Sequence, residues 1–110
     1  MTRFNMSHGE TIPFSDMAAQ FGLTANVELT YTVPGVITDS YRANFSFPED
    51  ANVWVSLNRT ATTPTVGTMS PDARCELNPD FRYVHGTDVI HFKSSAQVND
   101  AGVSLLQLPS

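Results

Sequence analysis

The feature that most constrains the fold is an alternation of apolar and polar residues with a period of two. In residues 27–33 an apolar side chain stands at every second position, and the pattern returns in residues 41–47 and 53–57. Successive side chains of a β-strand point to opposite faces of a sheet, so this alternation predicts strands with one buried and one solvated face. Sheets of that kind are commonly antiparallel.

Turn-forming residues separate these stretches and continue through the second half of the chain. Pro34-Gly35 and Pro48-Glu49-Asp50 are turn sequences, whereas residues 58–71 are rich in Thr, Pro and Gly and are expected to form a long loop or a weak edge strand. Further short strands are expected at residues 74–77, 81–84, 89–93 and 103–108. Short strands with polar turns between them predict an all-β fold, an antiparallel β-sandwich or a partly open barrel.

One short N-terminal helix is expected beside the strands. Ser15 is a suitable N-cap, Asp16 favours the positive end of a helix dipole, Met17 to Gln20 are good helix formers, and Gly22 is a natural C-terminal stop. The chain of 110 residues is therefore divided into an arm with this helix, residues 1–24, and a β-sandwich domain, residues 25–110.

The charge content argues against several classes of partner. Only 15% of the residues are charged, the formal net charge is −5, and five arginines and one lysine are scattered singly along the sequence. Binding to nucleic acid or to an anionic membrane relies on clustered cations, so neither is expected. Low charge also suits subunits held in an assembly more than free monomers, which predicts a homo-oligomer.

No residue constellation for catalysis or cofactor binding is present in the sequence. There is no Gly-x-Ser-x-Gly motif and no glycine-rich phosphate loop. His8, His85 and His91, even with Asp88, match no zinc-ligand spacing, and the single Cys75 is expected to be a small buried hydrophobe. We expect no enzyme activity, no cofactor and no metal site. An apolar N-terminal signal segment is also absent, so synthesis and retention in a cytoplasm are expected.

Four aromatic residues leave an alternative open. Tyr41, Trp54, Phe81 and Tyr83 have the character of a sugar-stacking platform, with Trp54 and Tyr83 as the main candidates in a carbohydrate-binding sandwich. Because Trp54 lies within an alternating strand, a place in the core or in a subunit interface is the favoured interpretation.

Several segments together resemble a known family. Residues 45–49 (Phe-Ser-Phe-Pro-Glu), the strand 53–57 (Val-Trp-Val-Ser-Leu) and residues 77–83 (Leu-Asn-Pro-Asp-Phe-Arg-Tyr) follow the order seen in the N-terminal, tail-attaching domain of tail fibres from short-tailed bacteriophages. Residues 87–92 and 103–108 fill the last two strand positions of that pattern. The resemblance covers about residues 40–108. Upstream, a segment that begins Gly9-Glu10-Thr11-Ile12 and ends Phe21-Gly22 resembles a stretch found in various phage virion proteins.

The resemblance implies a bacteriophage virion structural protein, a tail or fibre-attachment subunit that acts by protein–protein contacts. Tail fibres continue into a shaft and a receptor-binding tip, so the resemblance implies that this sequence would correspond to the docking module only. Its partners would be other virion proteins, that is, tail, fibre or capsid subunits, and it would be made in the host cytoplasm and located in the virion. A capsid decoration (cement) protein is the alternative within this class. The side chains expected at the contacts are Phe4, Met6, Phe14, Trp54, Arg59, Val66 and Met69.

Overall fold

The structure is a computed structural model that describes residues 14–64, 66–67, 69 and 74–109. This part of the chain contains eight strands and no helix. The strands are β1 (Met17–Leu23), β2 (Leu29–Thr32), β3 (Ser40–Ser46), β4 (Trp54–Leu57), β5 (Glu76–Leu77), β6 (Phe81–His85), β7 (Val89–Lys93) and β8 (Val98–Gln107).

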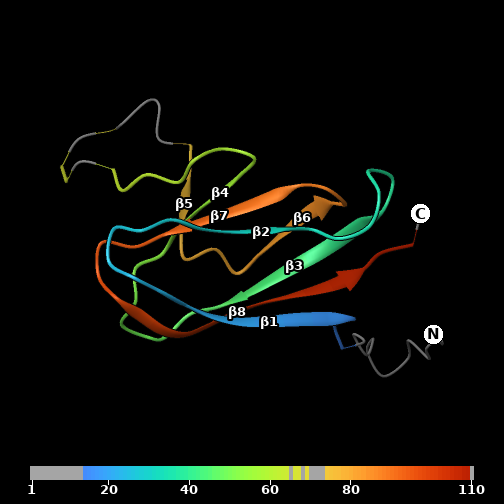
Figure 1. Cartoon of the computed structure of the whole chain (residues 1–110), viewed down its shortest axis with the longest axis horizontal. Coiled ribbons are helices and arrows are strands. Elements are labelled where there is room, and N and C mark those ends of the chain that lie inside the picture. The colour runs from blue at the N-terminus through green and yellow to red at the C-terminus, as the bar shows by residue number, and fades with distance from the viewer. Residues whose placement is uncertain (1–13, 65, 68, 70–73, 110) are drawn as a thin grey trace, which may run out of the picture.

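The strands form two antiparallel sheets of four strands each. The first sheet has the order β1-β8-β3-β6 and the second has the order β2-β7-β4-β5. In Figure 1, β1, β8 and β3 lie below β2, β7 and β4. The predicted all-β class and the antiparallel β-sandwich are confirmed, and the two separate sheets exclude the partly open barrel.

The core fills the space between the sheets as the alternation predicts. In β3, Tyr41 and Ala43 are buried whereas Arg42 and Asn44 are only partly covered. Phe92 of β7 is fully buried, and its ring centroid lies 4.6 Å from that of Phe21 in β1 and 6.0 Å from that of Phe45 in β3. These tilted and edge-to-face contacts join one sheet to the other.

The predicted N-terminal helix is wrong, because residues 17–23 form strand β1. The strand pairs with β8 from Met17 opposite Leu105 to Leu23 opposite Val98. A helix of two turns is marginal in water, whereas the strand buries Phe21 and Leu23 to 7% and 3% exposure. Tertiary burial therefore outweighs the local helix propensity. The last residues of the phage-like segment that ends at Gly22 therefore form part of β1 in the first sheet.

Two connections agree with the sequence and one strand is longer than expected. Gly35 has φ 93°, as the expected turn after Pro34 requires, and no strand forms among the described residues between β4 and β5. Strand β8 begins at Val98, five residues before the expected start at position 103. Asp100 there has φ 59°, an irregular position that alternation alone does not reveal.

Asn78, within the phage-like segment 77–83, ties the β5–β6 connection to the chain before β4. Its Nδ2 donates to the carbonyl oxygen of Ala51, and its Oδ1 accepts from the backbone N–H of Val53, both at 2.8 Å. Its own N–H donates to the carbonyl oxygen of Val53, also at 2.8 Å. Asn78 adopts φ 44°, which asparagine tolerates better than most residues.

Candidate interaction surfaces

The sandwich has two open sides, each formed by one end strand from each sheet. On one side β1 ends the first sheet and β2 ends the second. On the other side β6 and β5 are the end strands. End strands present backbone N–H and C=O groups without a sheet partner, so both sides are sites where another chain can be added.

An apolar groove runs between β1 and β2, and we call it the β1–β2 groove. Its volume is about 140 Å³, and its lining includes Met17 and Ala19 of β1, Tyr31 of β2 and Val33 just after it. Leu105 of β8 lies at its base. Strands β1 (MAAQFGL) and β2 (LTYT) carry no charged residue. This side therefore offers apolar surface and free backbone edges together.

The opposite side contains a larger cleft between β5 and β6, which we call the β5–β6 cleft. Its volume is about 540 Å³. Arg82 of β6 forms an ion pair with Glu76 of β5, and the Arg82 Nε lies 3.3 Å from the Glu76 Oε2. Arg59, Arg74 and Tyr83 also line the cleft. The two open sides thus differ sharply in charge.

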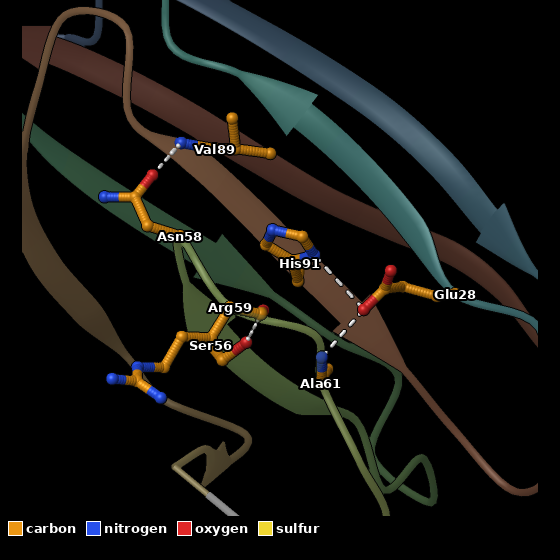
Figure 2. Close-up of polar contacts among 7 residues, drawn as sticks. All are labelled: Glu28, Ser56, Asn58, Arg59, Ala61, Val89 and His91. Carbon is orange, nitrogen blue, oxygen red and sulfur yellow. Dashed lines mark hydrogen bonds and ion pairs between the residues drawn. The ribbon is translucent and has the colours of Figure 1, made fainter.

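A polar network on the outer face of the second sheet holds the chain that follows β4 (Figure 2). The Asn58 Oδ1 accepts from the N–H of Val89 at 2.7 Å, and the Asn58 N–H donates to the Val89 carbonyl at 2.7 Å. The Ser56 hydroxyl donates to the Arg59 carbonyl oxygen. The fully buried Ala61 donates its N–H to the Glu28 Oε2 at 2.7 Å.

His91 completes this network. Its Nδ1 lies 3.1 Å from the same Glu28 Oε2, at ion-pair distance but without the alignment of a hydrogen bond. The side chains of His91 and Glu28 are 16% and 26% exposed. Glu28, just before β2, therefore holds both β7 and the segment after β4.

The expected contact residues do not form one surface. Phe14, Val66 and Met69 are 98%, 97% and 91% exposed, which suits contact residues. However, Figure 1 places the start of β1 and the segment 61–64 toward opposite ends of the molecule. Phe4 and Met6 lie outside the described residues. The assignment of these side chains to an interface remains a prediction.

The aromatic residues considered for sugar stacking are divided between the two sheets. Tyr41 is 3% exposed in the core, and Trp54 is half-buried in β4, with Leu77 and Lys93 as its register partners. Phe81 and Tyr83 lie in β6, with ring centroids 5.9 Å apart. Together with Tyr41 they belong to the first sheet, whereas Trp54 belongs to the second. The four rings therefore do not form a single platform.

Of the candidate metal ligands, Asp88 is engaged in structural contacts, and His8 lies outside the described residues. Asp88 accepts from the His85 N–H at 2.8 Å and from the Asn58 Nδ2 at 3.0 Å. In the described part of the chain, no group of three or more His, Cys, Asp or Glu side chains is placed to hold a metal ion. Across those same residues, no helix of the length and apolar character needed to cross a membrane is found.

The structure brings together residues that the sequence leaves apart. Arg59, Arg74 and Arg82 line one cleft although the sequence places them singly. Glu28 and Ala61 are likewise far apart in the sequence, so their hydrogen bond could not be predicted from it. Both arrangements depend on strand order, which has no local signal in the sequence.

Comparison with protein-family models, curated proteins and solved structures found no match to this chain.

Proposed function

We propose that the protein is a structural subunit of a bacteriophage virion, at the tail or fibre attachment, and that it acts by contacts with other virion proteins and with copies of itself. The phage assignment rests on the resemblance of residues 40–108 and 9–22. The observation that carries the contact function is the β1–β2 side, where the uncharged end strands flank an apolar groove.

Physical chemistry favours protein contact over other uses of this side. An exposed end strand of seven residues without a charge is a template for pairing with another strand, and natural monomers usually protect such edges with charges or very short strands. Strand β1 has neither protection, and β2, although only four residues long, carries no charge. A strand of a neighbouring subunit can satisfy the β1 backbone while its apolar side chains enter the groove.

The self-association is tested by the mass of the purified protein in solution over a range of concentrations. We expect oligomers, and we expect Ala18→Lys to convert them to monomers because Ala18 lines the groove and is exposed. Asn99→Lys is the matched control, since it adds the same charge at an exposed position that does not line the groove. A wild-type protein that stays monomeric, or an equal effect of both variants, would contradict the contact function.

The virion assignment needs a separate measurement. An antibody against the chain should detect it in purified phage particles and, after their dissociation, in the tail fraction. Detection in the capsid fraction instead would support the decoration alternative, and absence from the particles would contradict both.

A further inference from the structure

The β5–β6 cleft has a charge that differs from that of the protein around it. Five cations lie among the described residues, Arg42, Arg59, Arg74, Arg82 and Lys93, and three of them line the cleft. The same residues include nine acids, of which only Glu76 is part of the lining. A protein with a formal net charge of −5 thus gathers most of its described positive charge at one cleft.

The backbone at Arg59 is held in place by the polar network that Figure 2 shows. Asn58 pairs with Val89 through both its backbone and its side chain, and the Ser56 hydroxyl donates to the Arg59 carbonyl oxygen. The chain is fixed again two residues later, where Glu28 accepts from Ala61. The Arg59 side chain extends away from Glu28 in Figure 2, so that carboxylate does not engage it.

Arg82 is also oriented by its neighbours. It pairs with Glu76 and donates from Nη1 to the Phe81 carbonyl oxygen. Among the described residues, the close contacts between a basic and an acidic side chain are Arg82 with Glu76 and the imidazole of His91 with Glu28, and neither contains Arg59 or Arg74. The guanidinium groups of Arg59 and Arg74 can therefore donate to a ligand without breaking one of these pairs.

The floor of the cleft is apolar. Phe45, Val55, Val84 and Ile90 line it, and they come from the inner faces of both sheets. The volume of about 540 Å³ is within the range of small-molecule sites. Burial of a hydrocarbon group against this floor would be favourable, while the arginines at the rim would hold an anionic head group.

From these contacts we infer that the β5–β6 cleft binds an organic anion with an apolar body, with a carboxylate at Arg59 and Arg74 and the hydrocarbon between the sheets. This site is distinct from the β1–β2 groove and does not depend on the proposed virion function. The Ala18→Lys experiment tests the contact function, and the ligand-binding experiment tests the anion site. A negative result in one leaves the other proposal standing.

The test is isothermal titration calorimetry with three probes that share one tail: octanoate, octanol and octylammonium, all below the concentrations at which they aggregate. We expect octanoate to bind at least ten times more tightly than octanol, and octylammonium to bind more weakly still. Added salt should weaken octanoate binding, because it screens charges at an exposed rim. Equal affinities for the three probes, or no saturable octanoate binding, would overturn the inference.

Variants identify the cleft as the site. Arg59→Gln and Arg74→Gln should each raise the octanoate dissociation constant about tenfold. Arg42→Gln is the matched control, because Arg42 lies over the Phe81 ring at 4.0 Å and does not line the cleft. It should leave the constant within about twofold. If Arg42→Gln weakens binding as much as Arg59→Gln, the arginine cleft is not the site. Thermal unfolding of each variant checks that the fold is retained.

Discussion

The β1–β2 side and the β5–β6 side are both built from end strands, and they differ in length and charge. Strand β1 has seven residues and no charge, whereas β5 has two residues and contributes Glu76 to an ion pair with Arg82 of β6. Very short and charged edges resist pairing with other chains, and long uncharged edges invite it. One side of the same sandwich is therefore suited to adhesion between proteins and the other to a small charged ligand.

The contrast between the two sides requires that β1 is an integral strand of the sandwich, and the largest expected effect tests this. Phe21→Ala should lower the free energy of unfolding by about 3–5 kcal/mol, because it removes a ring that is 7% exposed and packs against Phe92. Phe14→Ala is the control, since Phe14 is 98% exposed, and it should change stability by less than about 0.5 kcal/mol. Urea unfolding followed by tryptophan fluorescence measures both. Similar small effects would mean that residues 14–23 form a loosely attached arm.

On the opposite side, Asn78→Ala should cost about 2–3 kcal/mol. The substitution leaves the N–H of Val53 and the carbonyl of Ala51 without their side-chain partner, and it places alanine at φ 44°. Asn99→Ala removes the same amide from an exposed position and should cost less than about 0.5 kcal/mol. The midpoint of urea unfolding separates the two. Equal midpoints would show that the β5–β6 connection is not held by Asn78.

The sequence predicts the positions of the strands better than the tertiary contacts between them, for a physical reason. Alternation records which face of a strand is buried, and it locates β2, β3 and β4 closely. It fails for β1 because the sequence Met-Ala-Ala-Gln favours a helix locally. The burial of Phe21 and Leu23 in the core, which stabilises the strand, is not visible in the local sequence. The arginine cleft could not be predicted from the sequence, because Arg59 and Arg82 line the same cleft only after the sheets have formed.

A smaller effect on the free energy of unfolding is expected from the hydrogen bond that connects the β1–β2 side to the β5–β6 side. Glu28, next to β2, accepts from the buried N–H of Ala61, which follows the cleft residue Arg59. Glu28→Ala should lower the free energy of unfolding by about 1–2 kcal/mol, because that N–H loses its partner. It should also weaken octanoate binding several-fold, whereas Glu49→Ala at an exposed turn should change neither quantity. Calorimetry and urea unfolding measure the two effects. Unchanged octanoate affinity in Glu28→Ala would show that Arg59 does not need this anchor.

The smallest effect should come from the ion pair that closes the β5–β6 side. The Arg82 and Glu76 side chains are 48% and 61% exposed, so solvent screens their attraction. A double-mutant cycle with Arg82→Gln and Glu76→Gln should therefore give a coupling energy below about 1 kcal/mol, falling further in high salt. Its role would be to charge a short edge rather than to stabilise the fold. That role predicts that the double variant, in which the β5 and β6 edges have lost this charged pair while Arg59 and Arg74 keep their charge, self-associates more than the wild type at equal concentration, as light scattering can measure. A coupling energy of several kcal/mol would instead assign the pair to stability, and the contrast between an adhesive side and a protected side would then need another origin.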